Sequence, residues 1–379
     1  MHSFKVLFAL LFLSVLPTNK TFAQPALSNN AFVSLLTCGP GNELYSVFGH
    51  TALRVSDPAT GIDVVYNYGT FDFDAPNFYM KFVKGDLQYF VSASTYNDFI
   101  YTYKYYNRDV YEQVLNLTPE QEQKIFSELN DVLQSDRKFY TYKFIGRNCT
   151  TMAGDVIELG SGTKISNKNR DTGKTYRRII YENLENHFYE NLGISLIFGA
   201  RTDIEMKELF LPVHLMEGVA DTNSSGNPLA KPSVTVNKAF ERSTPGSWWN
   251  NIYLFAGFMI VAAVFSNRRV VYVTFLVIAG LIGFFFSVVG FFSFHEEITM
   301  NYNILLLNPL YLLLLAFMLM KNAKATLWTI YTCLGLLVVY LVIMLNKPHL
   351  LLVLPIVVLA AAVLIRLRMQ TLKGLPRHS

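Results

Sequence analysis

The chain has 379 residues, of which 51% are hydrophobic and 16% are charged, and its formal net charge is +4 at pH 7. This composition is too apolar for a purely soluble protein of this length. The less apolar half carries no Lys/Arg patch interleaved with aromatic residues, so nothing in it points to nucleic acid as a partner. The apolar excess lies at the N-terminus and after about residue 250, which indicates two kinds of segment with different roles.

The N-terminal segment, residues 1–23, has the features of a signal peptide. His2 and Lys5 precede an apolar run at 6–16, and small residues follow up to Ala23. The apolar run is too short to span a bilayer, and its exit fits cleavage by a signal peptidase. We therefore predict export with cleavage near Ala23, and an uncleaved signal anchor is the alternative.

Residues 24–220 are predicted to form one α+β domain. The β-rich runs 51–55 and 62–68 are joined by a turn with Pro and Gly, which predicts a hairpin. The segments 86–92 and 108–117 are further strand candidates.

Helices are expected to follow these strands. Thr118 with Gln121 forms a capping box that opens an amphipathic helix, and Pro119 suits its first position. A second helix is predicted at 152–159, closed by Gly160. The segment 176–216 is mostly helical in pattern, and the polar residues 221–247 are predicted to be a linker into the membrane.

The C-terminal part, 248–379, holds five apolar runs of about the length that a membrane span needs. These runs are 248–265, 270–294, 304–320, 327–345 and 350–367. Basic loops at 266–269 and 321–324 alternate with loops that lack a basic cluster, and the tail is strongly basic. The positive-inside rule therefore places the N-terminal domain, His295 and His349 outside and the tail in the cytoplasm.

Three cysteines are present, and one of them is a candidate nucleophile. Cys333 lies in a predicted span and suits packing, whereas Cys38 and Cys149 lie where disulfides persist. Cys149 at a helix entrance is half of a disulfide with Cys38, a buried small side chain, or a nucleophile. The triplet from Asn148 to Thr150 is also a glycosylation sequon. A zinc site would need close ligand pairs, and neither C-x-x-C nor H-x-x-x-H occurs.

His50 is the predicted partner of Cys149. It follows a glycine at the entrance of the first hairpin strand. A helix N-terminus and a nearby imidazole both lower the pKa of a thiol, which makes it nucleophilic. A third polar group should orient the imidazole. Antiparallel pairing puts residue 67 roughly opposite residue 50, so we predict Asn67 for this role, with Tyr66 or Tyr68 as alternatives.

The order of His50 before Asn148-Cys149 resembles the circularly permuted papain-like folds, which include permuted NlpC/P60 proteins and the lecithin:retinol acyltransferase type. The fuller pattern TCGPGNELYSVFGHTALRV, YNYGTFDF, KFVKGDLQY and NCTT spans about residues 34–159. It resembles the Lnb-type lipoprotein N-acyltransferases, in which an exported papain-like domain precedes a C-terminal membrane bundle. The likeness continues more loosely through the five apolar runs.

This resemblance implies that Cys149 is the nucleophile and His50 the base of an acyltransferase. The implied acyl donor is a phospholipid and the implied acceptors are lipoproteins, with no metal or organic cofactor. A backbone N–H at the start of the 150–159 helix is expected to stabilise the oxyanion. The polar loop at the outer end of the second and third spans is expected to bind a lipid head group. The full set of expected substrate contacts is Asn148, Thr150, Tyr68, Arg54, His295, Asn301 and Asn303.

Two other functions fit the same sequence. A membrane-tethered cell-wall cysteine peptidase or amidase would use the same Cys–His pair without needing five spans. A non-enzymatic envelope scaffold would instead join Cys38 to Cys149 in a disulfide.

Overall fold

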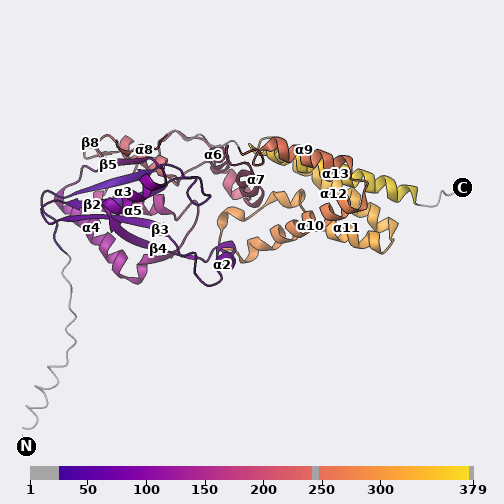
Figure 1. Cartoon of the computed structure of the whole chain (residues 1–379), viewed down its shortest axis with the longest axis horizontal. Coiled ribbons are helices and arrows are strands. Elements are labelled where there is room, and N and C mark those ends of the chain that lie inside the picture. The colour runs from indigo at the N-terminus through magenta and orange to yellow at the C-terminus, as the bar shows by residue number, and fades with distance from the viewer. Residues whose placement is uncertain (1–24, 241–246, 375–379) are drawn as a thin grey trace, which may run out of the picture.

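The computed structural model describes residues 25–240 and 247–374, so the predicted signal peptide 1–23 lies outside the described residues. An α+β domain occupies one end of an elongated molecule, and a bundle of apolar helices occupies the other (Figure 1). The chain leaves the bundle at the end far from the α+β domain.

The α+β domain is built on a seven-stranded sheet in the order β6-β4-β3-β2-β1-β5-β9, and every neighbouring pair is antiparallel. The strands are β1 (Phe32–Cys38), β2 (His50–Asp57), β3 (Ile62–Thr70), β4 (Gln88–Thr95), β5 (Val110–Val114), β6 (Phe139–Thr141) and β9 (Val234–Asn237). The predicted hairpin is confirmed as β2 and β3.

Helices cover both faces of this sheet. Three of them share a hydrophobic core with one face, and these are α4 (Pro119–Gln134), α5 (Cys149–Ser161) and α8 (Pro212–Asp221). The other face packs against α3 (Tyr96–Tyr105). The predicted capping box of α4 is confirmed, because Thr118 and Gln121 bond each other's backbone amides.

The predicted end of α5 at Gly160 is wrong by two residues. The helix ends at Gly162, whose φ of +70° suits a residue without a Cβ. Gly160 lies inside the helix instead, where a Cβ would stand 2.1 Å from Cγ1 of Ile125. This glycine therefore lets α5 lie close against α4, and that contact helps to fix the start of α5.

The first half of the predicted linker 221–247 belongs to the domain. Short strands β7 (Asn223–Ser224) and β8 (Asn227–Pro228) form a hairpin, and β9 pairs with β5 at the sheet edge. Leu229 between them is fully buried. The polar composition of this segment reflects an edge strand and a turn, which leave most of their side chains in solvent.

The bundle has four segments that are long and apolar enough to cross a membrane, at 269–292, 296–319, 323–344 and 350–373. Its helices are α9 (Ile252–Val264), α10 (Arg269–Phe292), α11 (Leu310–Leu319), α12 (Ala323–Met344) and α13 (Leu350–Lys373). The first predicted span, 248–265, appears as the 13-residue helix α9, which is shorter than expected. The segment 296–319 contains two 3-10 turns, η3 (Glu296–Ile298) and η4 (Tyr302–Leu305), before α11.

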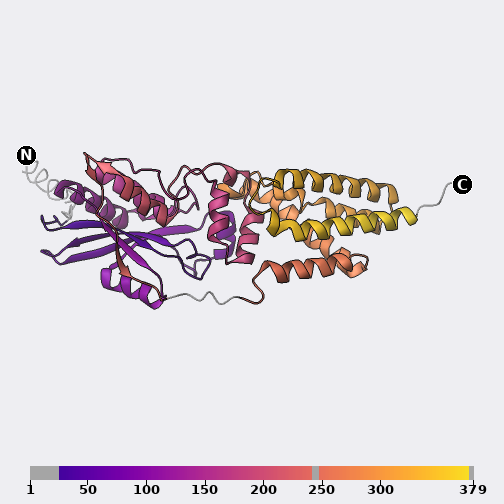
Figure 2. The ribbon, with the colours of Figure 1, turned by 90° about the horizontal axis from the view of Figure 1, so that it is seen from above.

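Short helices join the two parts. Helices α6 (Tyr176–Asn183) and α7 (Phe188–Ile197) lie between the sheet and the bundle (Figure 2). The side-chain amide of Asn301 donates to the carbonyls of Leu196 and Ile197 at 2.9 and 3.0 Å. Asn303 donates to the carbonyls of Ser195 and Leu196 at 3.1 and 2.9 Å.

These bonds correct the expectation that Asn301 and Asn303 bind a lipid head group. Both side chains are buried, and both cap the last turn of α7, whose carbonyls have no partners within the helix. They hold the bundle to the α+β domain, so the polar loop serves docking at these two positions.

Arg177 at this junction gives a test of the docking. It is buried and donates to Asp203 at 2.6 Å and to the carbonyls of Ser195, Phe198 and Gly199. Arg177→Met should destabilise the full chain by about 3–5 kcal/mol, because it breaks a largely buried ion pair and leaves three carbonyls without their donor. Thermal unfolding in detergent measures the loss. Arg178→Met, which removes an exposed ion pair with Glu182, should change stability by less than about 1 kcal/mol, and an equal loss in both variants would contradict this account.

Candidate active site

Cys149 is the first residue of α5, and Asn148 fixes its position. The side-chain oxygen of Asn148 accepts the backbone N–H groups of Thr150 and Thr151 at 2.8 and 3.0 Å. Its side-chain NH₂ donates to the carbonyls of Phe144 and Phe210 at 2.7 and 2.9 Å. Asn148 is therefore a buried helix cap, and all of its polar atoms have partners within the protein. It caps the turn that carries Cys149, so its polar atoms are not free for the expected substrate contact.

His50 stands at the first position of β2, directly after a glycine that the turn requires. Gly49 has a φ of +87°, and a Cβ there would lie 2.6 Å from the carbonyl oxygen of Cys38. Only glycine fits both conditions. The turn thereby delivers His50 to the sheet end at which α5 begins.

Asn67 does not lie directly opposite His50 in the sheet, because β3 pairs Asn67 with Ala52. The register is thus two residues from the predicted one. Residues two apart on a strand share a face, and the side chain of Asn67 still reaches His50, with 3.2 Å between Nε2 and Oδ1. The predicted neighbourhood of His50 and Asn67 is therefore present by a diagonal contact.

The surroundings of Cys149 lower the pKa of its thiol. Burial alone would raise it, but the charge and a hydrogen bond of His50 act in the opposite direction. The backbone amide of Thr51 and the hydroxyl of Thr150 add to this lowering. With the Nε2 of His50 turned to Asn67, the other ring nitrogen is left for the thiol. The net effect favours the thiolate form of Cys149.

Cys38 behaves differently from Cys149. It is fully buried on β1, and burial raises the pKa of its thiol to about 12. All three cysteines are free thiols in the structure. The disulfide that the scaffold interpretation requires is therefore not formed, and the opposite pKa shifts favour Cys149 over Cys38 as the nucleophilic thiol.

Two tyrosines complete the surroundings of Cys149, and the sequence analysis missed both. A Cβ on Gly69 would lie 3.8 Å from Cβ of Cys149, 3.9 Å from Cε2 of Tyr142 and 4.0 Å from the hydroxyl of Tyr140. Burial raises the pKa of both tyrosines, so both stay protonated. Tyr140 is 2% exposed, and its hydroxyl has no acceptor among the described residues.

The backbone amides at the start of α5 are mostly engaged. Asn148 accepts those of Thr150 and Thr151 through its side chain and that of Met152 through its carbonyl, at 3.1 Å. The amides that were expected to stabilise an oxyanion are therefore occupied. Within the described residues, the amide of Cys149 itself has no partner and remains available.

Three predicted substrate contacts lie away from the thiol or are fully engaged. Tyr68 is buried in the core beneath α4 and α5. Arg54 lies four residues along β2 from His50, where it pairs with Asp63 and Glu112 and stacks on Tyr96.

Thr150 is buried, and its hydroxyl is 3.0 Å from that of Thr51. Its hydroxyl also lies 3.9 Å from Sγ of Cys149, so Thr150 links α5 to β2 beside the thiol. The sequence did not distinguish this structural contact from a substrate contact, because both need a polar side chain beside the thiol.

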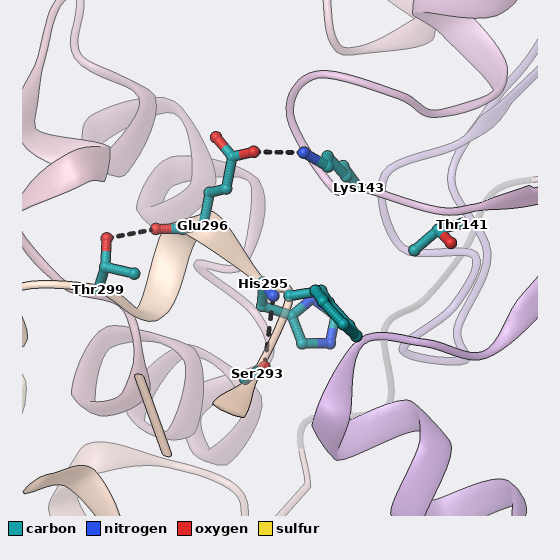
Figure 3. A pocket seen from close by; sticks show the side chains of 7 residues that line it. Thr141, Lys143, Ser293, His295, Glu296 and Thr299 are labelled. Carbon is teal, nitrogen blue, oxygen red and sulfur yellow. Dashed lines mark hydrogen bonds and ion pairs between the residues drawn. The ribbon is translucent and has the colours of Figure 1, made fainter. Parts of the chain in front are cut away.

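A pocket of about 440 Å³ opens where the domain meets the outer end of α10. Its lining residues are Thr141, Lys143, Ser293, Phe294, His295, Glu296 and Thr299. Figure 3 shows the ion pair between Lys143 and Glu296 across one side of it. The expected head-group residue His295 lines this pocket, and Thr141 lies on β6 between the two tyrosines near Cys149.

Two family models match the chain. Residues 19–182 match the Lnb N-terminal periplasmic domain, and residues 243–375 match the Lnb transmembrane domain. The chain belongs to the Lnb family. Its α+β domain is therefore periplasmic and precedes a multi-span transmembrane domain, and the first match contains His50, Asn67 and Cys149. No curated protein and no solved structure matches the chain.

Membership of the Lnb family implies lipoprotein N-acylation and partners related to lipoproteins. In residues 25–240 and 247–374, no group of three or more His, Cys, Asp or Glu side chains is placed to hold a metal ion. The chemistry available at the site is that of a thiol, an imidazole, an amide side chain and two phenols.

Proposed function

We propose that this Lnb-family chain is a lipoprotein N-acyltransferase that uses Cys149 as its nucleophile. It would move an acyl chain from a phospholipid, through a thioester, to the α-amine of a lipidated N-terminal cysteine. The observation that carries this proposal is the free thiol of Cys149, with its pKa lowered beside His50, in a periplasmic domain docked on a membrane bundle.

We further propose that residues 24–220 and the added edge strand form a permuted papain-like domain. A cysteine opens a helix that packs on an antiparallel sheet, and a histidine on that sheet precedes it in the chain. That order and geometry support the assignment. Residues 1–23 are proposed as the signal peptide that exports the domain.

In the first half-reaction, the Cys149 thiolate attacks the carbonyl carbon of a phospholipid ester. The ester C–O bond breaks, and His50 gives its proton to the leaving oxygen of the lysophospholipid. In the second, the α-amine attacks the thioester as His50 takes its proton. A C–N bond forms, the C–S bond breaks, and the thiolate returns. Asn67 would hold the imidazole in the useful orientation throughout.

The oxyanion of both tetrahedral intermediates needs donors near Cys149. We assign this role to the amide of Cys149 and the hydroxyl of Tyr140. Among the described residues, the amide of Cys149 has no hydrogen-bond partner, and the buried hydroxyl of Tyr140 has no acceptor for its proton. Preorganised donors of this kind stabilise developing charge without reorganising.

Tyr140→Phe tests the second donor. Because phenylalanine fills the same buried space, the chain should fold normally while kcat falls about 100-fold. Acyl transfer by the purified full chain measures the rate, and thermal unfolding checks the fold. Tyr66→Phe is the matched control. Tyr66 is equally buried, but its hydroxyl donates to the side-chain oxygen of Asn130 at 2.9 Å and does not face the thiol. Unchanged kcat in Tyr140→Phe would remove Tyr140 from the oxyanion site.

Mass spectrometry of lipoprotein N-termini tests the proposed function as a whole. Cells that contain the chain should carry N-acylated lipoproteins, and cells without it should carry free α-amines. Identical N-termini in both would contradict the proposal. Cleavage of cell-wall peptides by the purified chain, with no need for lipid, would establish the peptidase alternative instead.

A further inference from the structure

Helix α2 (Phe78–Lys84) is a short helix with no buried residue. Tyr79 is 82% exposed and Met80 74%, and large apolar side chains on a soluble surface rarely gather in this way. Their exposed neighbours extend the apolar surface along the preceding loop. We call this surface the α2 patch, and it consists of Tyr45, Phe73, Tyr79, Met80, Phe82 and Val83.

The α2 patch is attached to the outer end of a membrane-crossing helix. The backbone N–H of Phe294, just after α10, donates to the carbonyl of Lys84 at 2.7 Å, and the Ser293 hydroxyl donates to the carbonyl of Val83 at 3.1 Å. His295 lies 2.8 Å from the carbonyl of Phe82. Figure 1 shows α2 beside this end of α10.

The turn after α2 requires glycine for this attachment. Gly85 has a φ of +73°, and a Cβ there would lie 3.0 Å from Cδ2 of His295. Exposed Trp248 and Tyr253 near the start of α9 form an aromatic belt of the kind found at membrane surfaces. The α2 patch therefore lies at the level of the periplasmic leaflet.

A row of aromatic rings leads from α2 to the thiol. Phe78 stands 6.1 Å from Phe71, Phe71 stands 5.2 Å from Tyr89, and Tyr89 stacks on Tyr142 at 4.6 Å between ring centroids. Tyr142 and Cys149 then flank Gly69, as described above. Each of these four rings is partly exposed.

We propose that the α2 patch inserts into the periplasmic leaflet and that a phospholipid acyl chain reaches Cys149 along the aromatic row. The insertion stands on the geometry alone, whereas the acyl route rests on the proposed function. Lys81 on α2 suits the phosphates of the head groups next to an inserted apolar face, whereas Lys84 is paired with Asp86. The occupant of the patch is therefore the lipid acyl chain rather than a second protein.

Fluorophore labelling tests the insertion without any catalysis. In a Cys149→Ala background the remaining cysteines are buried, so Tyr79→Cys can be labelled selectively with an environment-sensitive dye. In phospholipid nanodiscs, lipids brominated on their acyl chains should quench this dye, and aqueous iodide should not. The control is Tyr105→Cys on α3, 73% exposed, which lies away from the bundle and should show the reverse. Equal iodide quenching at both positions would overturn the insertion.

Acyl transfer from membrane phospholipid tests the route. The double variant Tyr79→Ser with Met80→Ser should lower the rate of this transfer at least about tenfold. Burial of each large apolar side chain in the bilayer raises the affinity of the patch for lipid by about that factor. The loss should be much smaller with a short-chain soluble thioester as donor. The matched control, Tyr101→Ser with Tyr105→Ser, removes two equally exposed rings from α3 and should leave transfer unchanged.

The outcomes separate the two parts of the proposal. Normal transfer by the Tyr79 and Met80 variant would overturn the route along the aromatic row. If the unaltered protein inserts α2 but transfers no acyl chain, the route and the proposed function are both overturned. The insertion then still stands.

Discussion

Replacing Cys149 with alanine is expected to abolish acyl transfer, with a loss of at least about 10³-fold in kcat/KM. The site offers no second nucleophile that could take its place, because Cys38 is fully buried and burial raises its thiol pKa to about 12. Transfer from labelled phospholipid to a diacylglyceryl-cysteine peptide by the full chain in proteoliposomes measures the loss.

Cys38→Ala is the control for this variant. It removes a thiol of the same domain that points into the core beneath α3, so most of the activity should remain, with some loss of stability. If Cys38→Ala were inactive and Cys149→Ala active, the nucleophile would be Cys38 and the assignment of Cys149 would be wrong.

Replacing His50 with alanine is expected to lower kcat/KM about 10²–10⁴-fold, the range that a general base contributes. It should also change the pH dependence of the thiol. In the unaltered chain the pKa of Cys149 is lowered, and thiolate is lost only as the pH falls below that lowered value. Without His50, burial dominates and raises the pKa, so reaction needs a higher pH. The rate of Cys149 alkylation by iodoacetamide, measured against pH, reports this shift without any substrate.

The alkylation profile also tells a catalytic histidine from a structural one. Asn67→Ala should leave His50 on β2 but remove the contact that orients its ring. Its alkylation profile should therefore lie between those of the unaltered chain and of His50→Ala. If His50→Ala alkylates with the pH midpoint of the unaltered chain, His50 does not act on the thiol.

The helices and strands with local signals were predictable. The hairpin of β2 and β3 follows from its turn, and α4 follows from its capping box. The interior strand β1 was missed because both of its faces are buried, so its sequence FVSLLTC shows no regular alternation of polar and apolar residues. The edge strand β9 was missed because it has four residues, none of them buried, within a segment whose polar residues are typical of a linker.

The pair of Cys149 and His50 was predictable from residue type and place, since a helix entrance and a strand start are local features. The other site residues depend on the tertiary fold. Tyr140 lies on β6 and Tyr142 directly follows the strand, and a spacing of two residues in extended chain is a signal for one shared face. Nothing in the sequence shows that this face meets Cys149, because β6 reaches the sheet only through β4.

The roles of Asn301 and Asn303 could not be predicted for the same kind of reason. A polar residue at a membrane boundary fits a lipid ligand and a helix cap equally well until the neighbouring element is known. Here that element is the end of α7, which comes more than 100 residues earlier in the chain.

Detection of an acyl-thioester on Cys149 tests the central claim most directly. The purified full chain is incubated with acyl-labelled phospholipid and no acceptor, and the retained label is treated with neutral hydroxylamine. The account predicts label that hydroxylamine releases, that is absent from Cys149→Ala, and that a diacylglyceryl-cysteine peptide with a free amine discharges while its N-acetylated form does not. Acyl transfer to the peptide with no label on Cys149 under single-turnover conditions would contradict it.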